Sequence, residues 1–323
     1  MKQLYLNNIV VFSFEVIIVC WIATNKQAIF IVKVYTSLFL KVLDRGVWGS
    51  GFSSSIFAKM LKETLIKATF AGAKILQQYF RGTFTISSKS NINDLVTQAD
   101  HESEQAIFEV IKQEFPEHYI LSEESGEFKM DSNIKWIIDP IDGTVNFANG
   151  IPICCVSIGV EQDGKMILGA VYNPFMNEFF FGEKGLGATL NDEIIRVSDK
   201  NDVMRSCLVT GFPYSYLNEP NGPLEVFDTL IRNNIPMRRL GSGAIDLCWV
   251  AAGRFDGFYE HKLNAWDSAA GFLIVEEAGG KVTDFKGNYY SPYQPNILAT
   301  NGKIHDDLLS AINGEWNPGY VKS

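Results

Sequence analysis

Apolar side chains recur at helical spacing in two stretches of the chain. Over residues 60–79 they fall at alternating steps of four and three, which predicts an amphipathic helix packed on a core. Over residues 101–115 a similar pattern follows an acidic start, which predicts a second helix with Asp100 at or near its N-terminus. The apolar positions are Leu61, Leu65, Ala68, Gly72 and Ile75 in the first helix and Ala106, Ile107, Val110, Ile111 and Phe115 in the second.

Runs of β-branched and aromatic residues occupy the middle of the chain. The runs at residues 153–160, 165–172 and 178–181 are separated by Asp163-Gly164 and Asn173-Pro174, which are typical of hairpin turns. We therefore expect an antiparallel sheet there. Further short strands are expected at residues 86–90, 119–121 and 194–197, with a glycine-rich turn over residues 185–192.

The pattern changes near residue 200. From there on, expected strands and helices alternate, which is typical of an α/β unit. The expected strands are residues 208–210, 237–240, 257–259 and 281–284, and the expected helices are residues 220–234, 244–252 and 267–278. We expect a domain boundary near Lys200, between a first half at residues 60–200 and a second half at residues 201–323.

An apolar run at residues 136–138 leads directly into Asp139-Pro140. Because proline fixes φ and donates no backbone hydrogen bond, we expect it to end the strand and to leave Asp139 and Asp142 at the strand exit. A helix that opens near Gly143 would point its N–H groups at the same place. Two carboxylates there would repel each other unless a cation lies between them, and oxygen ligands without His or Cys favour Mg²⁺. The alternative is a strand end followed by an aspartate helix cap.

Residues 1–59 differ from the rest of the chain. They hold apolar stretches at residues 9–23 and 28–43, which are interrupted by charged residues and fall short of the roughly 20 residues of a membrane span. No small-residue cleavage site of a secretory signal follows the first stretch. Three alternatives remain: a membrane anchor, a targeting sequence, or an upstream extension of a chain that starts at Met60. We favour the last, and a peptide from residues 1–59 in mass spectra of the native protein would refute it.

Charge and cysteine content narrow the classes of function. The chain of 323 residues has a net charge of −9 and a pI near 5.1, without a cluster of Lys or Arg, so a nucleic-acid-binding surface is not indicated. The five cysteines and four histidines share no ligand spacing, which argues against a zinc site and a disulfide framework. We expect a reducing compartment, the cytoplasm.

Three motifs carry a resemblance to a known family. They are SEES at residues 122–125, DPIDGT at residues 139–144 and NAWDSAAG at residues 264–271. Together they resemble the inositol monophosphatase family, over about residue 60 to the C-terminus, and Arg238-Arg239 resembles its bacterial members. The resemblance implies a layered αβαβα sandwich of α+β or α/β class. It also implies a Mg²⁺-dependent, lithium-sensitive phosphomonoesterase that forms a homodimer.

The resemblance further implies two or three Mg²⁺ ions. Glu123, Asp139 and the backbone carbonyl of Ile141 would hold the first ion, Asp139, Asp142 and Asp267 the second, and Glu123 would assist a third. Seen alone, Asp267 is more typical of a helix N-cap, and its agreement with the other two motifs favours the ligand.

Thr144 and Asp100 are the implied catalytic pair. In the family's pattern Asp100 holds Thr144, and Thr144 positions a Mg²⁺-bound water for attack. Glu123, as a metal ligand, is the third implied catalytic residue. The N–H groups of Gly143 and Thr144 would bind the phosphate. The alternative role of Asp100 is a helix cap, which is compatible with the first role.

A polyol substrate would be bound by residues outside the metal motif. The implied contacts are Asp142, Gly241, Ser242, Gly243, Glu260 and Asp267. The glycines could equally form an ordinary turn before the next helix. The family usually has alanine at the position of Gly243, which puts the substrate preference in question. Lys89 aligns with a lysine near the phosphate, with a solvated surface lysine as the alternative.

The resemblance implies hydrolysis of inositol monophosphate, a small-molecule phosphomonoester, and the chemistry of the implied metal ligands suits water attack without a covalent phosphoenzyme. Alternatives in the same superfamily are phosphatases for fructose 1,6-bisphosphate, histidinol phosphate or 3′-phosphoadenosine 5′-phosphate. A regulatory binding protein on this fold is a further alternative, although a purely structural role does not need a group of mutually repelling acids. Membrane contact through residues 1–59 is not favoured.

Overall fold

The computed structural model describes residues 50–88, 95–213 and 222–316. The chain divides into two units, Met1–Phe57 and Ala58–Ser323, and the fold and site below belong to the second. Residues 1–49 of the expected N-terminal extension and Lys89 lie outside the described residues. The boundary near Lys200 stays a prediction.

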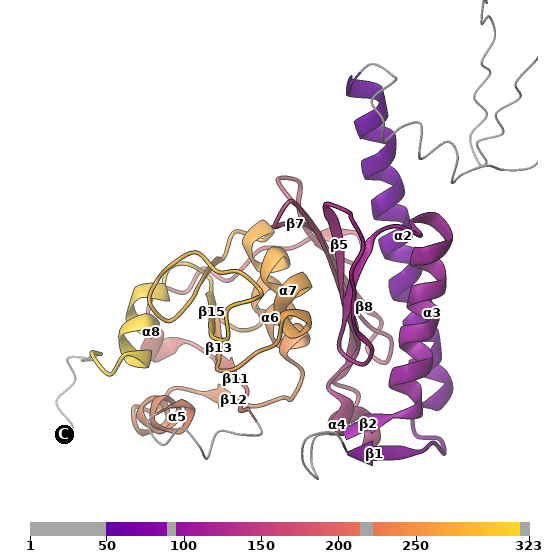
Figure 1. Cartoon of the computed structure of the whole chain (residues 1–323). Coiled ribbons are helices and arrows are strands. Elements are labelled where there is room, and N and C mark those ends of the chain that lie inside the picture. Colours follow the sequence, from indigo (N-terminus) through magenta and orange to yellow (C-terminus); the bar gives the residue numbers. More distant parts are fainter. Residues whose placement is uncertain (1–49, 89–94, 214–221, 317–323) are drawn as a thin grey trace, which may run out of the picture. The chain divides into compact units, whose positions relative to one another are not determined.

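Two sheets form the framework of the second unit (Figure 1). The larger has the strand order β10-β9-β8-β7-β6-β5-β3-β4, and the smaller has the order β12-β11-β13-β15-β14. The larger sheet consists of β3 Tyr119–Ser122, β4 Gly126–Phe128, β5 Ile134–Asp142, β6 Cys155–Gln162, β7 Lys165–Asn173, β8 Glu178–Glu183, β9 Gly187–Leu190 and β10 Glu193–Ile194. The smaller consists of β11 Leu208–Thr210, β12 Met237–Arg238, β13 Gly257–Glu260, β14 Lys281–Thr283 and β15 Ile297–Thr300. A separate pair is formed by β1 Ile86–Ser88 and β2 Leu95–Thr97.

Helices lie on both faces of each sheet (Figure 1). The part of α2 (Ser50–Tyr79) in this unit and α3 (Gln98–Glu114) cover one face of the larger sheet, and α6 (Gly243–Ala251) and α7 (Ala265–Glu277) lie between the sheets. The outer face of the smaller sheet is covered by α5 (Pro223–Arg232) and α8 (His305–Ile312). This arrangement confirms the expected αβαβα sandwich.

How much of a helix is buried depends on whether it lies between the two sheets or on the outside. Nine residues of α7 are buried, including the continuous run from Ser268 to Val275, because sheets lie on both of its sides. In α5 only Pro223, Val226 and Leu230 are buried, which is the single apolar stripe of a helix that faces solvent. The core of the unit therefore centres on α6 and α7.

Three glycines lie side by side across the larger sheet under α7. Gly159 of β6 pairs with Gly169 of β7, which pairs with Gly182 of β8. A Cβ on Gly169 would lie 2.7 Å from the carbonyl oxygen of Ala270 in α7. The missing side chains therefore let α7 approach the sheet closely, and α7 carries Asp267 in its first turn.

The expected strand end at Asp139-Pro140 is wrong, because β5 continues to Asp142. Its pairing with β3 stops at Ile138, and its register with β6 shifts between Asp139 and Asp142. Pro140 thus lies at a bulge where the hydrogen-bond ladder is already interrupted, so its missing N–H is tolerated. The two carboxylates lie on the last residues of the strand itself.

Some element boundaries also differ from the prediction. α2 reaches back beyond Met60 to Ser50, the first described residue, and residues 50–59 contain no proline that would stop a helix. β9 replaces the turn expected over residues 185–192, and the strand expected over residues 194–197 ends at Ile194. β2, β4, β15 and α8 were not expected, and Gly126, which we expected in a loop, begins β4.

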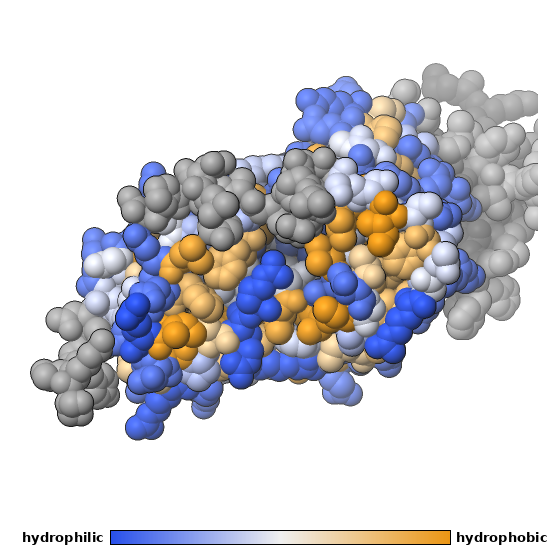
Figure 2. Space-filling model, turned by 90° about the horizontal axis from the view of Figure 1, so that it is seen from below, coloured by the Kyte–Doolittle hydropathy of each residue, from blue (hydrophilic) through white to orange (hydrophobic). Residues whose placement is uncertain are grey.

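The surface shows scattered apolar side chains. Ile86, Leu224 and Ile231 are exposed, and Figure 2 shows hydrophobic patches separated by hydrophilic side chains on one face. Scattered exposure of this kind is normal and does not indicate a docking surface. Among the helices of the described residues, none has the length and apolar character needed to cross a membrane.

Candidate active site

The end of β5 leads through Gly143 into the short helix α4 (Thr144–Ala148). At the bulge, Oδ1 of Asp139 accepts a hydrogen bond from the N–H of Ile141 at 3.0 Å. Gly143 has a φ of 90°, and a Cβ there would lie 2.9 Å from the carbonyl oxygen of Ile153. Both the backbone conformation and the close contact therefore require glycine at this turn.

Thr144 lies against Asp100. Its hydroxyl donates at 3.2 Å to Oδ1 of Asp100 and at 3.0 Å to the carbonyl oxygen of Ile141. Oδ2 of Asp100 accepts from the N–H of Thr97 at 2.7 Å and from its hydroxyl at 2.6 Å, which forms the capping box of α3. Asp100 thus caps a helix and contacts Thr144 at the same time.

Asp142 connects the larger sheet to the loop before α6. Its Oδ2 accepts hydrogen bonds from the hydroxyl of Ser242 at 2.6 Å and from the N–H of Ala244 at 2.7 Å. Ser242 is the N-cap of α6, Gly243 is the first residue of that helix, and Gly241 has a φ of 91°. The structure therefore brings Asp142 into contact with the loop predicted to bind substrate.

Glu123 and Asp267 come from two further elements. Glu123 follows β3, and its N–H donates to the carbonyl oxygen of Ile138 in β5 at 3.2 Å. Oδ2 of Asp267 accepts from the N–H of Asn264 at 2.7 Å in a capping box. Asn264, and not Asp267, is therefore the N-cap of α7.

Burial and mutual repulsion disfavour the charged forms of these carboxylates. Burial raises the pKa of Asp139 well above its usual range, and neighbouring charges, above all that of Glu123, raise it further. Burial raises the pKa of Asp142 to about 6, although the hydrogen bond from Ser242 opposes the shift. Burial, followed by the charge of Glu123, raises the pKa of Asp267 as well. The four carboxylates are thus close enough to repel one another.

The donor types of this group fit Mg²⁺. Carboxylates and a backbone carbonyl supply only oxygen atoms, which hard cations prefer. Within the described ranges, no three His, Cys, Asp or Glu side chains are already arranged around one point. Asp142 and Asp267 instead accept hydrogen bonds from backbone N–H groups. Both bonds end on Oδ2, so the second oxygen of each carboxylate, Oδ1, could bind a metal while these bonds stay.

Glu260, at the end of β13, lies beside Gly243. A Cβ on Gly243 would lie 3.9 Å from Oε2 of Glu260. Burial, with the charge of Asp142, raises the pKa of Glu260 to about 8.

Asp246 in α6 is a further buried carboxylate near Glu260 that the sequence motifs do not include. Burial, followed by the charge of Glu260, raises the pKa of Asp246. No residue of the described part hydrogen bonds to its Oδ1, and its only signal in the sequence is an acid in a helix's first turn.

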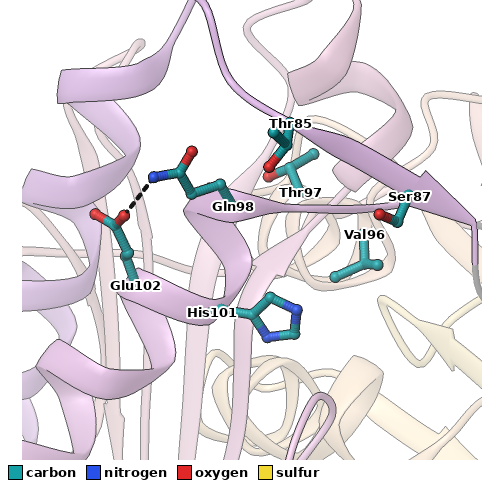
Figure 3. Close-up of a pocket in the computed structure, with 7 residues that line it drawn as sticks. All are labelled: Thr85, Ser87, Val96, Thr97, Gln98, His101 and Glu102. Atoms are coloured by element: carbon teal, nitrogen blue, oxygen red, sulfur yellow. Dashed lines mark hydrogen bonds between the residues drawn. The ribbon is translucent and has the colours of Figure 1, made fainter.

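A separate hollow of about 360 Å³ lies beside β1, β2 and the first turn of α3 (Figure 3). Its lining residues are Thr85, Ser87, Val96, Thr97, Gln98, His101 and Glu102. In Figure 3 the side-chain amide of Gln98 turns toward Glu102, to which it donates at 2.8 Å. Of the site residues described above, only Thr97 lines this hollow. Its hydroxyl donates to Asp100, so Thr97 lies between the hollow and the candidate site.

Comparison with known proteins decides the family. The sequence profile of the inositol monophosphatase family matches residues 59–316. The chain belongs to the inositol monophosphatase family. It is 42% identical over 273 residues to the inositol-1-monophosphatase of Synechocystis sp., and this match covers 84% of this chain and 95% of that protein. It is 41% identical over 254 residues to the Nus factor SuhB of Pasteurella multocida, and this match covers 78% of this chain and 95% of that protein.

A solved structure of the same type agrees with this membership. The extragenic suppressor protein suhB from Bartonella henselae is 37% identical, with a TM-score of 0.75, and the match covers 78% of this chain and 98% of that one. As a member of the inositol monophosphatase family, the chain has the fold of a phosphatase family. The relatives carry different names, so the family alone does not decide the substrate.

Proposed function

We propose that the chain is a Mg²⁺-dependent phosphomonoesterase that hydrolyses inositol monophosphate to inositol and phosphate. The observation that carries this proposal is the contact between Thr144 and Asp100, at 3.2 Å, beside the buried carboxylate group around Asp139. A hydroxyl held by one carboxylate next to several others is suited to orient a water molecule for attack on a phosphate ester.

The carboxylate group would hold the cofactor. Glu123, Asp139, Asp142, Asp267 and the carbonyl oxygen of Ile141 would bind two or three Mg²⁺ ions. When bound, these ions would neutralise charge on the phosphate and lower the pKa of a coordinated water. The reason to expect a cation is the raised pKa of Asp139, which burial and the charge of Glu123 cause, since buried carboxylates that disfavour one another's charge need positive charge between them.

Thr144 orients the attacking water in this proposal. Its hydroxyl hydrogen is given to Asp100 or to Ile141, so Oγ1 can accept a hydrogen bond from water. The water's proton can then pass through Oγ1 to Oδ1 of Asp100, while Oδ2 stays bound to Thr97. The N–H groups of Gly143 and Thr144 would receive the phosphate oxygens.

Inositol is the proposed leaving group because polyol-binding groups adjoin Asp142. The hydroxyl of Ser242 lies 2.6 Å from Asp142, and Glu260, at the end of β13, lies close to Gly243, the residue after Ser242. Carboxylates and hydroxyls suit the hydroxyl groups of a cyclic polyol, which can both donate and accept. The relative from Synechocystis named inositol-1-monophosphatase supports the same substrate.

A panel of phosphomonoesters tests the proposal. The pure full-length chain is incubated with Mg²⁺ and inositol 1-phosphate, fructose 1,6-bisphosphate, histidinol phosphate or 3′-phosphoadenosine 5′-phosphate, with and without Li⁺, and released phosphate is measured. We expect the highest kcat/KM for inositol 1-phosphate, and inhibition by Li⁺. A higher value for another ester would reject the proposed substrate. No release from any ester would reject phosphatase activity.

The variant Asp139→Asn tests whether the negative charge of Asp139 is needed for hydrolysis. Its amide oxygen can still accept from the N–H of Ile141, so the bulge is kept, whereas the negative charge is lost. We expect phosphate release to fall by at least about a hundredfold with an unchanged circular dichroism spectrum. Unchanged turnover would contradict the role of Asp139.

Relatives named Nus factor SuhB favour a second candidate, a regulatory binding function on this fold. Asp139→Asn separates the two candidates, because it should remove hydrolysis and leave the surface unchanged. If the variant restores growth of cells that lack the protein as well as wild type does, the regulatory candidate is supported. If only wild type restores growth, hydrolysis is the function that the cell needs.

A further inference from the structure

One face of α3 contacts the segments that form the proposed site. Asp100, Ser103 and Glu104 are spaced i, i+3 and i+4, so their side chains lie on the same side of the helix. Asp100 contacts Thr144, and the hydroxyl of Ser103 donates to the carbonyl oxygen of Pro140 at 3.0 Å. Two of the three residues thus hold the DPIDGT segment against α3.

Glu104 holds a different segment, the turn after β3. Its Oε1 accepts hydrogen bonds from the hydroxyl of Ser122 and, at 3.1 Å, from the N–H of Ser125. Its Oε2 accepts from the hydroxyl of Ser125. Glu123 lies between these two serines. Both ends of the turn that carries a proposed metal ligand are therefore bound to one carboxylate of another element.

The burial of Glu104 makes these bonds strong. The residue is only 4% exposed, and a buried carboxylate without hydrogen-bond donors would be strongly destabilising. Its donors come from Ser122 and Ser125, and hydrogen bonds to a charged acceptor are about twice as strong as neutral ones. The turn is thus fixed relative to α3 as well as to its own strand.

We propose that Glu104 is a positioning residue that fixes the turn at residues 122–125 so that Glu123 can bind Mg²⁺. The inference rests on the proposed function, because it takes Glu123 as a metal ligand. Glu104 itself contacts neither metal nor substrate in this proposal. Residues that support a metal ligand by hydrogen bonds typically change metal affinity by about 10–100-fold when they are replaced.

The affinity of the full-length chain for Mg²⁺ tests the proposal. Metal-free protein is titrated with Mg²⁺ in an isothermal titration calorimeter, and thermal unfolding is followed in EDTA. Glu104→Ala should weaken Mg²⁺ binding by about tenfold or more. Glu104→Gln keeps an oxygen at the position of Oε1 and should weaken binding by less than about threefold. Glu109→Ala is the matched control, because Glu109 is exposed on the same helix, and it should bind Mg²⁺ like wild type.

Ser125→Ala gives an independent measurement if Glu104→Ala does not fold. It removes one donor and leaves Glu104 the hydroxyl of Ser122 and the N–H of Ser125, so it should lower the unfolding temperature in EDTA by only a few degrees and weaken Mg²⁺ binding by about two- to fivefold. The proposal would be overturned if Glu104→Ala binds Mg²⁺ with wild-type affinity. If Glu104→Ala does not fold, wild-type affinity in Ser125→Ala would overturn it instead. Equal losses in Glu104→Ala and Glu104→Gln would also overturn it, as would a wild-type chain that binds no Mg²⁺.

Failure of the proposed function would give a different result. A wild-type chain that binds Mg²⁺ but releases no phosphate from any ester would reject the phosphatase. The calorimetric comparison of the Glu104 variants would still decide the role of Glu104 in that case, because it measures binding and not turnover.

Discussion

Thr144 has one hydroxyl proton and two acceptors, Oδ1 of Asp100 at 3.2 Å and the carbonyl oxygen of Ile141 at 3.0 Å. Only one acceptor receives the proton at a time. The hydroxyl can therefore exchange its acceptor by rotation alone, without a change in the backbone. Such a group is suited to accept a proton on one side while it donates on the other.

Thr144→Val tests this role, because valine keeps the shape of the side chain and lacks the hydroxyl. We expect kcat for phosphate release to fall by about 10²–10³-fold with little change in KM. Thr144→Ser keeps the hydroxyl and should stay within about tenfold of wild type. Steady-state kinetics with inositol 1-phosphate measure both, and wild-type kcat in the valine variant would exclude the role.

Gly211 leaves room for the carboxylate of Glu260. A Cβ on Gly211 would lie 2.2 Å from both oxygens of Glu260, so Gly211→Ala must move this side chain. We expect KM for inositol 1-phosphate to rise by about three- to tenfold. KM for p-nitrophenyl phosphate, which has no polyol, should not change. Equal changes for both substrates would show that Glu260 does not contact the inositol ring.

Candidate site residues in contiguous motifs could be predicted from the sequence, whereas the residues that hydrogen bond to those motifs could not. Thr144 and Asp142 stand in one hexapeptide whose residue types suggest the chemistry directly. Ser103 and Glu104 belong to no motif, and their partners Pro140 and Ser122 lie 37 and 18 residues away. Only the fold shows such contacts, because they depend on how α3 packs on the larger sheet.

Among the strands, those set by local sequence could be predicted, and those that depend on pairing partners elsewhere could not. The hairpins of β6, β7 and β8 follow from local alternation and turn residues, and the structure has them as antiparallel neighbours. β15 is a four-residue strand that lies between β13 and β14, the two strands that precede it in the chain. Its place depends on partners that no local pattern identifies, which is why it was not predicted. The extension of β5 through Pro140 depends likewise on where its neighbours stop pairing.

Gly169→Ala should destabilise the fold, because a Cβ would lie 2.7 Å from the carbonyl oxygen and 3.1 Å from the Cα of Ala270. We expect the free energy of unfolding to fall by about 1–3 kcal/mol, measured by urea denaturation. Gly243→Ala is the control, since the nearest heavy atom to its Cβ would be 3.8 Å away, and it should be as stable as wild type. A Gly169→Ala chain of wild-type stability would show that α7 can move away from the sheet without cost.

At the scale of the whole molecule, the candidate site is assembled from distant parts of the chain. Asp139 and Asp142 come from β5, Glu123 from the turn after β3, and Asp267 from α7. Their burial and repulsion, which raise the pKa of Asp139 and Asp267, oppose folding when no cation is bound. Function and stability are therefore in conflict at this site.

Mg²⁺ should stabilise the full-length chain. Ligand at a hundred times its Kd adds about 2.7 kcal/mol, so Tm should rise by several degrees between EDTA and saturating Mg²⁺. Asp139→Asn removes one repelling charge, so we expect a higher Tm than wild type in EDTA and a smaller rise with Mg²⁺. Asp131→Asn, at an exposed position, is the control and should behave like wild type. Differential scanning fluorimetry measures these values, and a wild-type Tm that is the same with Mg²⁺ and with EDTA would contradict the prediction.

The two oxygens of Asp100 serve different purposes. Oδ2 completes the cap of α3 through Thr97, and only Oδ1 contacts Thr144. A relative that had lost the ability to hydrolyse phosphate esters would still need this aspartate to begin the helix. When genomes are searched for active enzymes among proteins of this kind, the aspartate is therefore a poor marker of activity. The threonine, which caps no helix, is the more informative position.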